Sequence, residues 1–432
     1  MRFRASQVAT AVGGELVGDD VWLDGATQDS REVASGSLFV PLLAERDGHE
    51  FVEAAMAAGA GAHLTARDPG SGTAVRVADT GAALLALGAA ARDSLDGPVV
   101  GITGSVGKTS VKDLTRAVLA RVGPVHASER SFNNEIGVPL TLLNAPAHGP
   151  VVVELGARHV GDIASLCGVA RPDVGVLTTV AVAHTGEFGS LDAVARTKGE
   201  LFDALPPDGC ALYNADVPAV VEQAGRARSQ RLSFGEAGEV RARAVAVDDD
   251  LRASFRLESP WGRIDVRLAV HGAHMVPNAL AAAAVGLVLD VPLAEVAAGL
   301  AEGPASAWRM ALGTAPSGLR VLNDAYNANP ASTSAALEAL AALPVDGRRV
   351  AVLGLMAELG DLAVEEHLAV AARVAELGIE LMAVGTDLYG VEPLADVEAA
   401  GAALDLGGAD AVLVKGSRVA GLEVLAERLL AG

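Results

Sequence analysis

A glycine-rich stretch at residues 101–110 has the residue types and the spacing of a phosphate-binding loop. It lies between the apolar run 98–100 and the helix-like run 111–119, so we expect strand, turn and helix in that order. Glycines let backbone N–H groups converge on phosphate oxygens, Lys108 adds a positive charge, and the Thr109 hydroxyl can bind Mg²⁺. The spacing is not the common one, because Ile102 stands where a standard loop has glycine. A turn that binds nothing is the disfavoured alternative, and we predict an ATP site made by Thr103, Gly104, Ser105, Val106, Gly107, Lys108, Thr109 and Ser110.

Three side chains downstream of this loop are candidates for metal binding or catalysis. Glu154 ends the apolar strand-like run 151–153, where a carboxylate commonly holds Mg²⁺; a cap or loop carboxylate is the alternative. His184 follows the strand-like run 174–180, and although a lone histidine is more often structural, it could bind a second metal ion here. Lys198 falls on an expected helix, and its context alone predicts only a surface lysine.

Further polar groups gather near expected strand ends and helix starts. His274 and Asn278 are four residues apart, so both can face one way on a helix; reading an adenine edge and being a helix-start polar pair are equally supported. The stretch 324–330 carries several polar groups after a strand, which indicates a site, and Arg309 is a candidate phosphate clamp. The segment 29–31 is interpreted as a solvated turn, and a contact to a diphosphate ligand is the less favoured alternative.

Composition limits the classes of protein to which the chain can belong. Its 432 residues suffice for two or three domains, and 51% hydrophobic against 20% charged residues indicates a globular protein. The net charge of −21 argues against a nucleic-acid binder but not against a nucleotide site. Two distant cysteines, no apolar leader and no run long enough to span a bilayer predict a soluble cytoplasmic protein without membrane insertion.

The order of expected elements predicts an α/β protein with three domains. Residues 1–97 form a small N-terminal α/β domain, and residues 98–314 alternate strands and helices as a parallel-sheet P-loop ATPase domain does. Within the latter, residues 231–270 alternate polar and apolar positions, which favours a small antiparallel sheet. Residues 315–432 predict a C-terminal Rossmann-like domain, joined by a linker at residues 313–318.

Together these stretches resemble the Mur ligases, the ATP-dependent amide-bond ligases of peptidoglycan precursor synthesis. The resemblance covers nearly the whole chain, and Gly104 to Thr109 is similar to the shortened P-loop of the family. Three parts are similar to the branch that adds D-alanyl-D-alanine: residues 133–139, residues 324–330, and residues 29–31 followed by 38–41 and 47–49. The Tyr-Asn-Ala-Asn-Pro run at 326–330 is the most specific of these.

The resemblance implies roles for individual residues. Catalysis is expected from Lys108, Glu154, His184 and Lys198. Two Mg²⁺ ions are expected on Thr109, Glu154, His184 and Lys198, the last as a carbamate derived from carbon dioxide. Nucleotide contacts are expected from Asn278, Arg309 and Asp324. Substrate contacts are expected from Ser30, Arg31, Asn133, Asn134, Tyr326, Asn327, Asn329, Lys415 and Ser417; of these, Ser30 and Arg31 match a uridine diphosphate region and Lys415 and Ser417 a segment near the incoming amine.

The reaction implied by the resemblance joins D-alanyl-D-alanine to UDP-N-acetylmuramoyl-tripeptide through an acyl phosphate, in a monomer whose C-terminal domain closes over ATP. The third residue of the tripeptide, lysine or diaminopimelate, stays open. Leu355 and Ser131 depart from the family pattern, where aspartate and asparagine are usual. The alternatives are a folylpolyglutamate-synthase-like ligase, which residues 326–330 disfavour, and a non-catalytic P-loop switch protein, which gives no reason for a polar site at 324–330.

Overall fold

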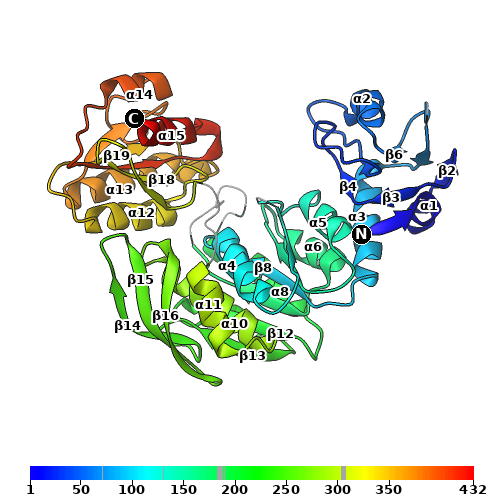
Figure 1. Ribbon diagram of the computed structural model, residues 1–432, viewed down its shortest axis with the longest axis horizontal. Coiled ribbons are helices and arrows are strands. Elements are labelled where there is room, and N and C mark those ends of the chain that lie inside the picture. The colour runs from blue at the N-terminus through cyan, green and yellow to red at the C-terminus, as the bar shows by residue number, and fades with distance from the viewer. Residues whose placement is uncertain (71, 130, 182–187, 189, 303–307) are drawn as a thin grey trace.

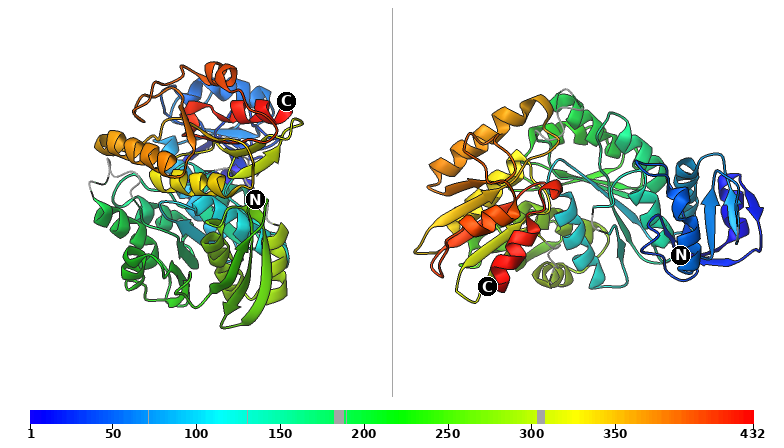
Figure 2. Two further views of the ribbon diagram at one scale, coloured as in Figure 1. Left: turned by 90° about the vertical axis from the view of Figure 1, so that its left-hand side faces the viewer. Right: turned by 90° about the horizontal axis from the view of Figure 1, so that it is seen from above.

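The structure is a computed structural model that describes residues 1–432 apart from 71, 130, 182–187, 189 and 303–307. Its sheets form three groups along the chain, and the central group lies between the other two, so that the molecule is an arc (Figures 1 and 2). This confirms the expected α/β class with three domains. The exact domain boundaries stay predictions.

The N-terminal domain is built on a five-stranded sheet in the order β2-β7-β6-β5-β4 beside the pair β1-β3, counted among the described residues. Its core continues into the central domain, because α3 packs there on α5 (Gly137–Asn144) and α6 (Asp162–Ala170). The strands are β1 (Arg2–Arg4), β2 (Glu15–Val17), β3 (Trp22–Asp24), β4 (Ala26–Thr27), β5 (Leu38–Phe39), β6 (Ala62–Thr65) and β7 (Ala74–Arg76). The helices are α1 (Ala5–Val12), η1 (Gly48–Phe51), α2 (Val52–Ala57) and α3 (Thr80–Asp93).

The central domain contains a parallel sheet in the order β13-β12-β11-β8-β10-β9. Val151 and Val153 face the cluster of α5, α6 and α8, whereas Val152 faces that of α4 and α10, so apolar residues fill both sides. Its strands are β8 (Val99–Thr103), β9 (His126–Ala127), β10 (Val151–Glu154), β11 (Val174–Leu177), β12 (Cys210–Asn214) and β13 (Gln230–Phe234). Its helices are α4 (Lys108–Ala120), α5 (Gly137–Asn144), α6 (Asp162–Ala170), α8 (Leu191–Asp203), α9 (Pro218–Ala224), α10 (Met275–Val288) and α11 (Leu293–Glu302).

A small antiparallel sheet completes the central domain, as expected from the alternation in residues 231–270. It consists of β14 (Arg241–Val247), β15 (Arg252–Ser259) and β16 (Gly262–His271). The turn between β14 and β15 reaches the C-terminal domain, where Leu251 joins its core and Asp250 pairs with Arg320 at 2.8 Å. This sheet therefore supports the C-terminal domain from below in Figure 1.

The C-terminal domain has the strand order β17-β18-β21-β19-β20, parallel except for β17. The predicted linker at 313–318 is wrong: β17 pairs with β18, and residues 315–318 form the turn of that hairpin. Its strands are β17 (Ala311–Thr314), β18 (Arg320–Asp324), β19 (Arg349–Leu353), β20 (Glu380–Ala383) and β21 (Ala411–Lys415). Its helices are α12 (Pro330–Ala342), η2 (Gly360–Leu362), α13 (Ala363–Glu376), α14 (Val397–Ala403), η3 (Arg418–Ala420) and α15 (Glu423–Ala431).

The helices and the two cysteines bear on the expected absence of membrane spans and of disulfides. Across the described residues, no helix is both long enough and apolar enough to cross a membrane. Cys167 and Cys210 are buried and form no disulfide, as small apolar side chains in the core.

Candidate active site

A cavity of about 1300 Å³ lies where the carboxyl ends of the central strands meet those of the C-terminal sheet. Such ends are where parallel α/β sheets bind ligands. The predicted residues that line it are Ser105, Val106, Gly107, Lys108, Thr109, Ser110, Asn133, Asn134, Glu154, Lys198, Asn278, Arg309, Asp324, Tyr326, Asn327, Asn329, Lys415 and Ser417. Most of the predicted site is thus brought together from two domains.

The glycine-rich loop contains two glycines with positive φ, a conformation that glycine adopts without strain. Gly104 and Gly107 have φ of 151° and 88°, and a Cβ at Gly107 would lie 2.5 Å from Asn278 Oδ1. Helix α4 begins at Lys108, whose ammonium donates a 2.8 Å hydrogen bond to the Gly104 carbonyl. A helix N-terminus and a lysine thereby face the cavity together, which suits phosphate. Thr103 does not line it, since the side chain is buried and donates to the Leu155 carbonyl at 2.8 Å.

Glu154 is the buried carboxylate of the site, with 1% exposure. One oxygen accepts a 2.8 Å hydrogen bond from the Thr109 hydroxyl, and the other accepts one of 2.8 Å from the Asn133 amide. Arg309 in turn donates to Thr109 Oγ1 at 2.9 Å, and its Nε is buried without a partner among the described residues. Hydroxyl and carboxylate oxygens fit Mg²⁺ chemically, and a buried carboxylate held by uncharged donors gains from a cation.

Lys198 is buried, so the expectation of a surface lysine is wrong. It is 2% exposed, on the face of α8 that also buries Val194 and Leu201. Burial first, and the charge of Lys108 second, lower the pKa of Lys198 to about 7. The apolar residues four before and three after Lys198 are the sequence signal that was available for its burial.

The N-terminal end of α10 lies against the glycine-rich loop. Asn278 is half-buried against Gly107, and its amide lies 3.5 Å from the Met275 sulfur. His274 precedes α10, as expected, and burial lowers its pKa. The adenine-reading and helix-start interpretations of this pair both stay open.

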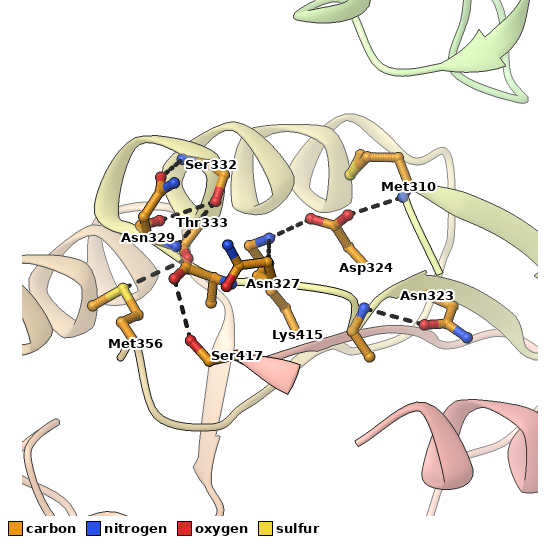
Figure 3. A network of polar contacts seen from close by, with 12 residues as sticks. Met310, Asn323, Asp324, Asn327, Asn329, Ser332, Thr333, Met356, Lys415 and Ser417 are labelled. Carbon is orange, nitrogen blue, oxygen red and sulfur yellow. Dashed lines mark hydrogen bonds and ion pairs between the residues drawn. The ribbon is translucent and has the colours of Figure 1, made fainter. Parts of the chain in front are cut away.

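The polar stretch after β18 forms a network with the end of β21 (Figure 3). The Lys415 ammonium contacts the Asp324 carboxylate and donates to the Asn327 carbonyl at 2.8 Å, while Asp324 also accepts from the Met310 N–H at 3.0 Å. Asn329 caps α12 by accepting from the Ser332 N–H at 2.9 Å. The network fixes this stretch against the C-terminal sheet.

Comparison with known proteins identifies the family. Residues 102–286 match the model described as "Mur ligase middle domain", and residues 308–418 match "Mur ligase, glutamate ligase domain". The UDP-N-acetylmuramoyl-tripeptide--D-alanyl-D-alanine ligase of Mycobacterium tuberculosis is 40% identical over 99% of this chain and 97% of its own, and that of Escherichia coli 37% over 98% and 97%. The chain belongs to the Mur ligase family.

Solved structures agree with this membership. A crystal structure of MurF from Acinetobacter baumannii aligns with a TM-score of 0.90 and 32% identity, covering 100% of this chain and 99% of its own. The MurF ligase of Thermotoga maritima, solved in complex with ADP, aligns with a TM-score of 0.81 and 27% identity over 94% and 97%. The resemblance that we inferred from the motifs is therefore confirmed.

Some predicted residues of this Mur ligase lie elsewhere. Ser30 and Arg31 belong to the N-terminal domain and do not line the large cavity; Arg31 is exposed and pairs with Asp29 at 2.6 Å. A second cavity of about 240 Å³ lies beside this segment, between the N-terminal and central domains, and is lined by Gln28 and Glu32. His184 falls outside the described residues. Among those that are described, no three His, Cys, Asp or Glu side chains are grouped for a metal ion.

Sequence reasoning missed several residues of the Mur ligase cavity. Arg158, His159 and Glu358 line it and were not predicted. Arg158 follows β10 and Glu358 follows β19, both at carboxyl ends of parallel strands. That position was the available signal, and it applies to the whole loop rather than to one residue.

Proposed function

We propose that this Mur ligase joins D-alanyl-D-alanine to UDP-N-acetylmuramoyl-tripeptide with ATP, giving the pentapeptide precursor, ADP and phosphate. One observation carries the proposal: a single cavity receives both the P-loop and the Tyr-Asn-Ala-Asn-Pro stretch at 326–330. The relatives that match the full length of the chain carry this activity in their names. We also propose that the protein acts in the cytoplasm as a monomer.

The first step activates a carboxylate. The terminal carboxylate of the tripeptide attacks the γ-phosphorus of ATP, ADP leaves, and an acyl phosphate forms. Two anions must approach each other, so positive charge is needed at the phosphate. Lys108 and the N–H groups at the start of α4 supply it, with Arg309, which contacts Thr109, as a second cation.

The second step forms the amide. The amine of D-alanyl-D-alanine attacks the acyl carbon, phosphate leaves, and a proton is lost from the amine. Lys415, Ser417, Tyr326 and the asparagines at 327 and 329 come from the C-terminal domain, so the amine is delivered from that side of the cavity. We assign Asn133 and Asn134, which line the cavity, to the acceptor substrate, and Ser30 and Arg31, which do not line it, to its uridine diphosphate end.

We also propose that magnesium binds here. Thr109 and Glu154 would supply oxygen ligands, together with His184 and a carbamate on Lys198. Bound there, magnesium supplies charge that offsets the phosphates. The lowered pKa of Lys198, about 7, supports the carbamate, because only the neutral amine reacts with carbon dioxide. A carbamate also exchanges a buried cation for an anion that a divalent ion stabilises.

A mixed-amine assay tests the function. The protein is given ATP, UDP-N-acetylmuramoyl-tripeptide and an equal mixture of D-alanyl-D-alanine, L-alanine, D-glutamate and a diamino acid, and products are identified by mass. We expect ligation of D-alanyl-D-alanine alone, and no phosphate release from Lys108→Ala. Ligation of another amine, or a fully active Lys108→Ala protein, contradicts the proposal.

A further inference from the structure

Side chains of the C-terminal domain hold the loop that follows β19 by hydrogen bonds. The Tyr389 hydroxyl donates to the Gly354 carbonyl at 2.9 Å, and His367 Nε2 accepts from the Met356 N–H at 3.0 Å. His367 is 0% exposed and stacks edge-on with Tyr389 at 4.7 Å. Burial lowers the pKa of His367, which keeps Nε2 free of a proton and able to accept.

The same loop ends on a strained residue that faces the cavity. Ser417 Oγ accepts from the Ala357 N–H at 2.9 Å, and the next residue, Glu358, has φ of 65°. A glutamate in this left-handed region costs about 1 kcal/mol or more and persists only where the surroundings impose it. These contacts hold the backbone at Glu358, whose side chain lines the cavity wall.

Glu358 faces a cation from the other domain. Arg158 follows β10 in the central domain, and one of its guanidinium nitrogens lies 3.7 Å from the Glu358 carboxylate. This separation is longer than a charge-assisted hydrogen bond, and the two side chains are 71% and 46% exposed. Both side chains line the cavity and are accessible to water there.

The charges match the second substrate of the proposed reaction. A free dipeptide carries an ammonium group at one end and a carboxylate at the other, so it needs one anionic and one cationic partner. We propose that Glu358 binds the ammonium group of the incoming D-alanyl-D-alanine and that Arg158 binds its carboxylate. The inference rests on the proposed function, and it makes the dipeptide a bridge between the two domains.

The position of Glu358 suits an amine that must reach an acyl phosphate. Glu358 lines the same cavity as Lys108 of the P-loop. An ammonium group held on Glu358 therefore lies in the cavity that receives the phosphate-binding loop. Both partners reach the same space as Lys198 and Asn133.

The experiment measures KM for each substrate in Glu358→Gln and Arg158→Gln. We expect KM for D-alanyl-D-alanine to rise about 10- to 100-fold in each, because each loses a charged hydrogen bond, with KM for ATP and for the nucleotide tripeptide changing less than about threefold. Glu358→Asp, which keeps the charge, should recover part of the loss. Glu376→Gln, which removes an exposed carboxylate paired with Arg373 at 3.0 Å, is the matched control and should behave as the unmodified protein.

A modified substrate assigns each end of the dipeptide. The C-terminal amide of D-alanyl-D-alanine lacks the carboxylate, so the unmodified protein should prefer the acid, and Arg158→Gln should lose this preference while Glu358→Gln keeps it. Equal rises in KM for all substrates, an unchanged KM for the dipeptide, or a preference that survives in Arg158→Gln would overturn the inference. If the unmodified protein ligates no D-alanyl-D-alanine at all, the proposed function itself fails instead.

Discussion

The Tyr326 hydroxyl donates a 2.6 Å hydrogen bond to the Ser131 hydroxyl, and the two residues belong to different domains. The guanidinium of Arg309 lies over the Tyr326 ring, 4.2 Å from its centre. Ser131 is one of the two positions where the chain departs from the family pattern. The departure therefore takes part in a contact between the central and C-terminal domains.

Removing this contact should loosen the arrangement of the domains. For Tyr326→Phe and Ser131→Ala we expect a larger radius of gyration by small-angle X-ray scattering without nucleotide, because a bond worth roughly 1 kcal/mol across the domains is lost. The double variant should be no larger than either single variant, since both remove the same bond. Tyr389→Phe, which removes a bond within the C-terminal domain, is the control, and an additive double variant would refute the coupling.

Gly107→Ala should weaken nucleotide binding. Its φ of 88° strains an alanine, and the added Cβ would lie 2.5 Å from Asn278 Oδ1. We expect the Kd for ATP, measured by calorimetry, to rise at least about tenfold. Gly168→Ala is the matched control, because a Cβ at that α6 position meets nothing within 4 Å; unchanged binding in both variants would exclude the loop as the ATP site.

The sequence predicted the parts of the site that depend on local chemistry. The P-loop needs only consecutive residues on a strand, a turn and a helix, and the structure has this order from β8 to α4. Glu154 and Asp324 end apolar strands. Because ligands bind at the carboxyl ends of parallel strands, both were predicted to be site residues, and both line one cavity. The Tyr-Asn-Ala-Asn-Pro stretch carried the resemblance further.

Other parts depend on packing between distant segments and were missed. The burial of Lys198 follows from how α8 packs on the sheet, and the facing of Arg158 and Glu358 follows from how two domains meet. Residues 313–318 look like a linker locally, but β17 pairs with β18 in a hairpin that places Leu312 opposite Leu322. The apolar residues around Lys198 indicate a buried helix face, but a local pattern does not specify which distant segments meet there.

Breaking the buried pair of Asp324 and Lys415 should destabilise the C-terminal domain. Lys415 has a side-chain exposure of 1%, and burial lowers its pKa while Asp324 opposes that effect. Asp324→Asn leaves an uncompensated charge, so we expect a loss of roughly 3–5 kcal/mol in thermal unfolding. The double variant Asp324→Asn with Lys415→Met should be more stable than Asp324→Asn alone; the opposite order would show that the pair is not the cause.

Activity should depend on carbon dioxide and on pH near 7. The pKa of Lys198 is about 7, so the neutral amine that forms a carbamate falls to about one tenth at pH 6 and rises to about nine tenths at pH 8. In carbon dioxide-depleted buffer we expect low activity that bicarbonate restores, with more bicarbonate needed at pH 6 than at pH 8. Activity indifferent to depletion at both pH values, or a fully active Lys198→Ala protein, would rule out the carbamate.

Lys198→Met should stabilise the protein while abolishing ligation. The pKa of Lys198 is about 7 in the folded protein against 10.5 ordinarily, so the folded state binds this proton more weakly than the unfolded state. The cost of this burial to the folded state is absent above pH 10.5, grows as pH falls from 10.5 to 7, and is greatest below pH 7. At pH 7 the lysine therefore costs on the order of 4 kcal/mol, which methionine avoids.

Thermal unfolding in carbon dioxide-free buffer with a chelator measures this cost. We expect Tm of Lys198→Met to exceed that of the unmodified protein by roughly 5 °C at pH 7, with the gain shrinking as pH rises toward 10. Bicarbonate with Mg²⁺ should raise Tm of the unmodified protein only, because methionine forms no carbamate. A gain in Tm that stays constant from pH 7 to 10 would mean that side-chain packing, rather than a buried charge, separates the two proteins.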